Sequence, residues 1–393
     1  MSGFEDLLEG IGVFQGRHAN AIVIVALLLT VFIGMGVANI RMETDLAKEM
    51  PKDMPIMKLQ NKVSETFGGY DVVIVVIRLD HSATQANAVQ DIRDPRVIKL
   101  ITELDSQIKK ENAVSSVNSL AQVFGQTGIP QTTEGVRAIL ERVPQAKTAF
   151  NKDYSATIVQ VNANLGSQEQ TVRDLQEAIK KDIDSSPVPP GVKVELTGMP
   201  PIRVVLMDTL QSDAVFTICL AALSILIVLL LISNPRSDGV VVFAPLVFGL
   251  IWTMGTMGWL NIALSIATVG VGAMILGLGV EYSVFYIERY NEEREKGYAQ
   301  INSMKLAMKE VGGAIIGSST TVIMGFLALT LASMPMIQHL GATLAIGIFY
   351  CVVAAIGLNP ALMVVHENVT HYLDERNHKK LDRRIREHHE ATK

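Results

Sequence analysis

The stretch IALSIATVGVGAMILGLGVEYSVFYI, residues 262–287, contains one charged residue, Glu281, among its 26 positions. A helix rises 1.5 Å per residue and needs about 20 mostly apolar residues to cross a hydrocarbon core of roughly 30 Å. The first 19 residues of the stretch, 262–280, are long and apolar enough for this. The stretch therefore predicts an integral membrane protein.

The composition of the whole chain agrees with this prediction. Hydrophobic residues make up 49% of the 393 residues and charged residues 19%, whereas soluble domains carry about 25% charged residues. The formal net charge of −5 excludes a generally basic nucleic-acid binder. Cys219 and Cys351 both lie inside apolar blocks, which excludes a disulfide scaffold. His366 and His371 are five residues apart, not the four of a helical metal pair, so we expect no metal and no cofactor.

Six apolar blocks predict a polytopic α-helical membrane protein with six transmembrane helices. The blocks are 21–38, 214–232, 240–260, 262–280, 311–332 and 340–365. The first block is 18 residues long, which exceeds the apolar region of a signal peptide, and we expect it to be retained as a helix.

Lysine and arginine orient the spans. With the N-terminus inside, 14 of the 34 basic residues lie in the inner segments, and none lies in the two short outer turns near 259–261 and 333–339. This positive-inside pattern predicts a multi-pass protein of the cell membrane with both termini in the cytoplasm. The expected organisation is a cytoplasmic N-terminus (1–20), a first span (21–40), an extracytoplasmic domain (41–211), five spans (212–365) and a cytoplasmic tail (366–393).

The extracytoplasmic domain alternates strand-like and helix-like segments. Strands are predicted at 71–79, 113–117, 154–165 and 192–196, with helices at 94–111 and 167–184 and an insertion at 120–153 that contains a helix at 132–142. The order βαβ–βαβ predicts an α+β ferredoxin-like domain. Since it contains no Ser–His–Asp candidate and no HExxH motif, we expect a domain that binds or conducts a molecule and is not an enzyme.

Glu281 is the residue of this chain that a membrane span disfavours most. Apolar sequence surrounds it, and an ionised carboxylate at such a position costs about 2.5–3.5 kcal/mol or more, so such residues usually face the interior of a bundle and serve a pathway. Burial disfavours the charged form, so a carboxyl here can exchange a proton as its hydration changes. In the alternative interpretation the span ends at Val280, and Glu281 reaches the cytoplasmic headgroups.

Small residues near Glu281 predict close packing of helices. They are Gly270, Gly272, Gly277 and Gly279 in the fourth span and Gly313 and Gly317 in the fifth. The hydroxyls of Thr320 and Thr321 follow and could bond to a buried carboxyl or, alternatively, only to their own backbone.

Five strings of this chain resemble the RND superfamily and, within it, the MMPL and hydrophobe-exporter branch. They are GLGVEYS at 277–283, ERY at 288–290, TVIMGF at 321–326, QHLG at 338–341 and NPAL at 359–362. The layout of one helix, a porter domain and five helices is also similar to that branch.

This resemblance implies an exporter of lipids or other hydrophobic molecules that is driven by the proton-motive force. Glu281 would be the proton carrier, Tyr282 its partner, and Thr320 and Thr321 candidate hydroxyls of the relay. The family usually has Asp at the position of Glu281, and its members usually carry twelve helices in two similar halves. We therefore expect a homodimer, with a higher homo-oligomer as the alternative. In the dimer, Glu281 of each copy would lie near Tyr282 of the other.

Two other functions remain open at this stage. A SecD/SecF-like accessory of protein export shares six helices and an external domain, but its specific strings are not found here. A lipid- or sterol-sensing module would use the same helices without a proton cycle. Replacing Glu281 by Gln would leave a sensing module intact and would inactivate a transporter.

Overall fold

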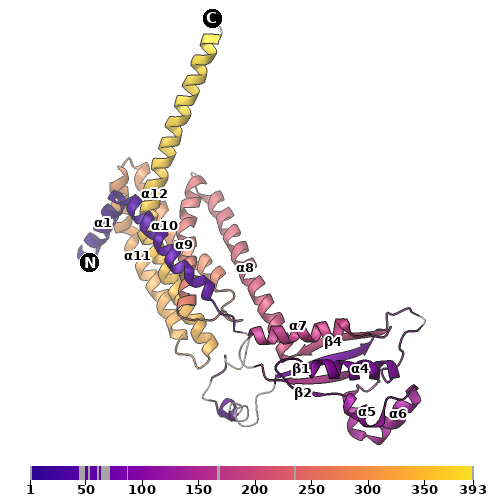
Figure 1. Cartoon of the computed structure of the whole chain (residues 1–393). Coiled ribbons are helices and arrows are strands. Elements are labelled where there is room, and N and C mark those ends of the chain that lie inside the picture. Colours follow the sequence, from indigo (N-terminus) through magenta and orange to yellow (C-terminus); the bar gives the residue numbers. More distant parts are fainter. Residues whose placement is uncertain are drawn as a thin grey trace. The chain divides into compact units, whose positions relative to one another are not determined.

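The computed structural model describes residues 2–43, 49–51, 54–59, 62, 71–85, 87–165, 169–233 and 236–391. These residues form two compact units, Met1–Pro51 with Leu210–Lys393, and Lys52–Thr209 (Figure 1). The first is helical and the second contains a four-stranded sheet.

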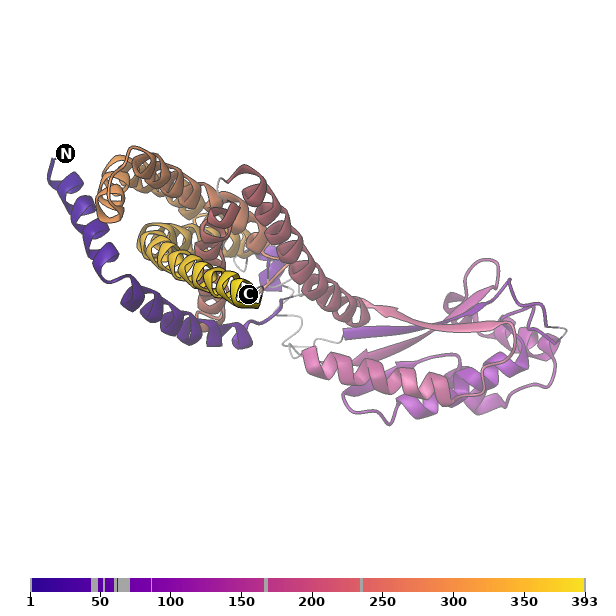
Figure 2. The same ribbon diagram turned by 90° about the horizontal axis from the view of Figure 1, so that it is seen from above.

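The helical unit confirms the predicted number of spans. Its elements are α1 (Ser2–Arg17), α2 (Ala19–Gly34), the 3-10 helix η1 (Met35–Asn39), the C-terminal part of α8 (Met199–Ile232), α9 (Arg236–Trp259), α10 (Val271–Glu295), α11 (Gln300–Leu329) and α12 (Pro335–Ala391). Six segments of the described chain are long and apolar enough to cross a membrane: Ala19–Asn39, Met199–Ile232, Asp238–Trp259, Val271–Glu295, Gln300–Leu329 and Pro335–Thr370. The packing centre is α12, which contacts α2, α9, α10 and α11; Figure 2 shows these helices around it.

The fourth span begins later than the prediction of 262–280. Helix α10 begins at Val271, and the preceding backbone pairs with the segment after the first span: Leu264 N donates to Arg41 O at 2.7 Å, and Glu43 N donates to Leu264 O at 2.9 Å. The backbone groups of this segment are thus satisfied outside a helix. Glu281 is the eleventh residue of the 25-residue helix α10, so the helix continues past Val280. The alternative that Glu281 reaches the cytoplasmic headgroups concerns the end of the membrane and stays a prediction.

Helix α1 was not predicted from the sequence. It contacts α12 where Pro360 leaves one backbone carbonyl of α12 without its helical hydrogen bond. Pro360 has no N–H, so the carbonyl of Ile356 loses its donor within the helix. Gln15 Nε2 of α1 donates to that carbonyl at 2.9 Å. On another face of α1, Glu9 pairs with Lys309 of α11 at 2.8 Å. Helix α1 therefore connects α11 and α12.

The second unit is an antiparallel sheet with helices. Its strands are β1 (Asp71–Leu79), β2 (Val114–Asn118), β3 (Ala156–Ala163) and β4 (Val192–Gly198), in the order β2-β3-β1-β4. All three strand pairs are antiparallel. The chain inserts α4 (Pro95–Ile108) between β1 and β2, and α7 (Glu169–Ser185) between β3 and β4. The insertion between β2 and β3 forms α5 (Ala121–Thr127), α6 (Thr133–Arg142) and the 3-10 helix η2 (Pro144–Ala149).

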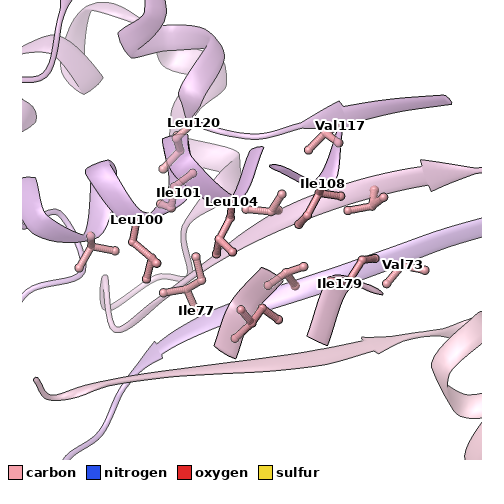
Figure 3. Packing of buried hydrophobic residues seen from close by; sticks show 14 of the residues in the cluster. Val73, Ile77, Leu100, Ile101, Leu104, Ile108, Val117, Leu120 and Ile179 are labelled. Atoms are coloured by element: carbon pink, nitrogen blue, oxygen red, sulfur yellow. The ribbon is translucent and has the colours of Figure 1, made fainter. Parts of the chain in front are cut away.

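The core of this unit lies where α4 and α7 meet the sheet. Asp94 caps α4 by accepting from Arg96 N, and Pro95 occupies its first turn. Apolar residues then recur every three or four positions on one face of α4 and are buried: Val97, Ile98, Ile101, Leu104 and Ile108. Figure 3 shows side chains of α4 gathered with Val73 and Ile77 of β1 and Ile179 of α7.

Candidate functional site

Helix α10 carries two different faces at the predicted site. Tyr282, Tyr286 and Tyr290, four residues apart, form one face and are fully buried. Glu281 lies on the other face and is exposed, as are the apolar side chains of Met274 and Phe285 one or two turns away. The prediction that Glu281 faces the interior of the bundle is therefore wrong for a single chain. Successive helical residues point about 100° apart, so Glu281 lies beside the tyrosine row, next to Tyr282, and not within it.

The neighbour predicted for Glu281 is also placed differently. Tyr282 is packed inside its own chain with Ile348 and Ala355 of α12 in the same cluster. A carboxyl of a second copy cannot reach a side chain with no exposed surface, so the expected contact of Glu281 with Tyr282 of the other copy is wrong for this conformation. Glu281 forms no ion pair with any described residue.

The two threonines bond to their own helix. Thr320 Oγ1 donates to Ile316 O at 2.6 Å, and Thr321 Oγ1 donates to Ser318 O at 2.7 Å. Both side chains are exposed on α11. Their hydroxyls are satisfied without Glu281, as the alternative interpretation of the sequence has it.

Five of the six predicted packing glycines divide into two groups. A Cβ on Gly272 would lie 2.5 Å from Ile218 Cδ1, and one on Gly279 would lie 2.7 Å from Cys351 Sγ, so both are packed. A Cβ on Gly270, Gly277 or Gly317 would meet nothing within 4 Å. Close packing at these three is therefore not found within one chain. Gly313 is half-buried.

The tightest helix crossing was missed from the sequence. It joins η1 to α9, where a Cβ on Gly36 would lie 2.1 Å from Gly255 O and one on Gly258 would lie 1.8 Å from Gly36 O. The spacing of Gly255 and Gly258 was the available signal, since three residues separate neighbours on one helix face. This crossing fixes the first span against the third.

A cavity of about 620 Å³ lies between α8, α9 and α10. Its walls are mainly apolar, with Ile225 and Val228 from α8 and Val284 from α10, and its acidic lining includes Asp238 and Glu288. This volume is within the range of small-molecule sites, about 300–1,000 Å³. Among the described residues, no group of three or more His, Cys, Asp or Glu side chains could hold a metal ion.

Comparison with known proteins gives consistent matches over most of the chain. The family model described as "MMPL family" matches residues 48–387. The membrane protein MJ1562 of Methanocaldococcus jannaschii is 34% identical over 367 residues, which cover 92% of this chain and 94% of that protein. The siderophore exporter MmpL5 of Mycobacterium tuberculosis is 28% identical over 228 residues, 56% of this chain and 23% of that protein. The apo-petrobactin exporter of Bacillus anthracis is 28% identical over 238 residues, 55% of this chain and 29% of that protein.

Among solved structures, the hedgehog release protein Disp from the water bear Hypsibius dujardini matches with a TM-score of 0.60 at 12% identity. The match covers 92% of this chain and 49% of that chain. At this identity the likeness concerns the fold. The chain thus spans about half the length of that structure and less than a third of the two exporters.

Proposed function

The chain belongs to the MMPL family, and from this premise we propose that it exports lipids or other hydrophobic or amphiphilic molecules across the cell membrane, driven by protons that bind Glu281. It is a transporter and not an enzyme. The relatives that support this proposal are named as exporters, and the apolar cavity between α8, α9 and α10 supports a hydrophobic cargo.

The domain between the first two spans is, in this proposal, an extracytoplasmic porter domain of ferredoxin-like fold, 41–211. The βαβ–βαβ order and the antiparallel sheet β2-β3-β1-β4 support that assignment. The positive-inside pattern supports cytoplasmic termini.

The single observation that carries the role of Glu281 is its position. A carboxyl in the middle of a membrane helix, with no ion pair to a described residue and with exposed apolar neighbours, is costly in its charged form and inexpensive in its neutral form. Such a group changes the energetics of its surroundings when it gains or loses a proton. Tyr282 adjoins it in the chain, and Thr320 and Thr321 are the proposed hydroxyls of the same relay.

The exposed face of α10 supports a homodimer. In one chain, a Cβ added at Gly277 or Gly317 would meet nothing within 4 Å, so a second copy has room to approach the backbone there. In this arrangement the two Glu281 faces lie toward the partner, and each Tyr282 stays inside its own copy.

Proton flux into proteoliposomes tests the proposed function. The wild type, Glu281→Gln and Glu281→Asp are compared under an imposed proton gradient, with lipids and hydrophobic dyes as cargo. We expect cargo-dependent flux in the wild type and in Glu281→Asp, which keeps a carboxyl, and none in Glu281→Gln. Equal activity of Glu281→Gln and the wild type refutes the proton-carrier role. Lipid binding by both proteins without any flux favours the sensing module.

Cysteine cross-linking tests the dimer. In a Cys219→Ala background, Gly277→Cys is expected to trap a dimer in membranes. Phe349→Cys, exposed on α12, is the control that should remain monomeric. A monomer for both variants contradicts the proposed interface.

A further inference from the structure

Four fully buried side chains of α10 and α12 hold polar atoms that no group of the described protein satisfies. They are the hydroxyls of Tyr282, Ser283 and Tyr286 and both amide atoms of Asn359, and none of these residues has more than 0% of its surface exposed. An unpaired polar group inside an apolar unit costs about 1–3 kcal/mol, and native proteins rarely leave several together.

The register of the two helices brings Asn359 of α12 to the level at which the row of α10 begins. Cys351 Sγ lies 4.0 Å from Ile275 O, and Tyr290 Oη donates to Glu367 Oε1 at 2.5 Å. The sequence separations of these pairs are 76 and 77, so α10 and α12 run parallel with a nearly constant offset. The same offset places Asn359 level with Tyr282.

One end of this group of residues is connected to solvent. Below Tyr282 and Tyr286 the row continues with Tyr290, whose hydroxyl donates to Glu367. Glu367 also accepts from Gln300 Nε2 at 2.9 Å and lies 3.4 Å from Arg294 Nη2. The side chains of Glu367 and Arg294 are 30% and 38% exposed, so the row ends at water.

The spacing of the row suits single water molecules. Four helical residues rise about 6 Å, and a water that bridges two hydroxyls spans about 5.5 Å, two hydrogen bonds of about 2.7–2.8 Å each. A tyrosine hydroxyl both donates and accepts, as does the side chain of Asn359. Buried waters occur where about three polar partners converge.

We propose that Tyr282, Ser283, Tyr286 and Asn359 hold a file of internal water molecules that continues through Tyr290 and Glu367 and carries protons between Glu281 and the solvent at the C-terminal end of α10. The inference rests on the proposed function. A proton leaves the Glu281 carboxyl for the first water, and each oxygen along the file accepts one proton as it gives up another. The last proton passes to the Glu367 carboxylate and from there to water, so no tyrosine becomes charged.

Two substitutions remove links of the file without adding charge and keep the branching of the side chain. Tyr286→Phe deletes one hydroxyl, and Asn359→Leu deletes both amide atoms. Tyr350→Phe is the matched control, because its hydroxyl lies outside the row, 3.0 Å from Thr256 Oγ1. We expect Tyr286→Phe and Asn359→Leu each to lower cargo-dependent proton flux at least about tenfold, which corresponds to a barrier higher by about 1.4 kcal/mol. Tyr350→Phe should keep the wild-type rate.

A second measurement reports the waters themselves and requires no transport. Hydroxyl radicals generated from internal water by a short X-ray pulse label the side chains that contact it. Wild-type protein in detergent should be labelled at Tyr282 and Tyr286 although both are buried, and Asn359→Leu should reduce that labelling. Unlabelled tyrosines overturn the inference. Wild-type flux that Glu281→Gln abolishes but Tyr286→Phe and Asn359→Leu leave unchanged also overturns it, and the proposed function then stands. Absence of flux in the wild type overturns the proposed function, and the route with it.

Discussion

Replacing Gly258 by alanine should separate the first span from the third. The added Cβ would lie 1.8 Å from Gly36 O, where ordinary contact begins at 3.4 Å, so it falls 1.6 Å short. Both sides of this contact are backbone, and no side chain can turn aside. Helix α9 and η1 must therefore move apart.

The expected magnitude follows from two opposing effects. Overpacking in a close-packed interior costs about 1–3 kcal/mol, and the absence of a flexible neighbour places this site at the upper end. Alanine in place of glycine favours a helix by about 1 kcal/mol. We expect Gly258→Ala to lower the free energy of unfolding by about 2 kcal/mol.

The two tryptophans of the chain report this crossing directly. Trp252 Nε1 donates to Thr30 Oγ1 at 2.8 Å, and Trp259 Nε1 donates to Ile33 O at 3.3 Å. Tryptophan fluorescence during unfolding by SDS in detergent micelles therefore follows the contact of α9 with the first span. Gly10→Ala in α1 is the control, since nothing lies within 4 Å of its added Cβ, and it should be as stable as the wild type or up to about 1 kcal/mol more stable. The reasoning is refuted if Gly258→Ala unfolds at the wild-type SDS fraction with unchanged fluorescence.

Two further predictions concern carboxyl groups with shifted pKa values. Hydrogen bonds from Arg93, together with one from Arg137 of α6, hold the pKa of Asp91 well below its usual 3.8, so the stability that they contribute is present above that value and is lost as the pH falls through the lowered pKa. Asp91→Asn should cost about 1–2 kcal/mol at pH 7 and should speed the hydrogen exchange of α6, and unchanged exchange contradicts this. Burial raises the pKa of Glu49 above its usual 4.5, with His339 partly opposing, so this group's contribution to stability is full below pH 4.5 and is lost as the pH rises through the raised pKa. Glu49→Gln should remove that loss in thermal unfolding measured between pH 4 and 8, whereas an unaltered pH dependence would show that burial of this carboxyl is unimportant.

The spans were predictable because a bilayer demands length and apolarity, which sequence records directly. The residues at which the spans begin and end were harder to predict. The stretch 262–270 is as apolar as a span, but its backbone pairs with residues near Arg41, more than 200 positions away, and no local pattern reveals such a pairing. Helix α1 was missed for a similar reason, since its partner is a carbonyl that Pro360 frees in α12.

The position of the candidate site could be proposed from the sequence, but the face of the helix that Glu281 occupies could not. Glu281 was evident as a candidate because a single carboxyl among apolar residues rarely serves the stability of a membrane helix. The face that it occupies was not evident, because lipid and protein interior are both apolar and Met274 and Phe285 would suit either. In the sequence, Asn359 was noted only as part of the string NPAL at 359–362, which resembles the family. Its buried amide became informative when the structure placed it level with Tyr282.

The energetics of Glu281 give a reason for two copies. Covering the α10 face buries Glu281, which costs about 2.5–3.5 kcal/mol when the carboxyl is charged and little when it is neutral. Binding of one proton therefore shifts the equilibrium between an open and a closely packed α10 face about 70- to 400-fold. A switch from 1:99 to 99:1 needs about 5.5 kcal/mol. One Glu281 supplies too little for that switch, whereas two carboxyls at one interface supply about 5–7 kcal/mol. In the proposed exporter, a dimer protonated at both copies can therefore move between two well-separated states, and a half-protonated dimer cannot.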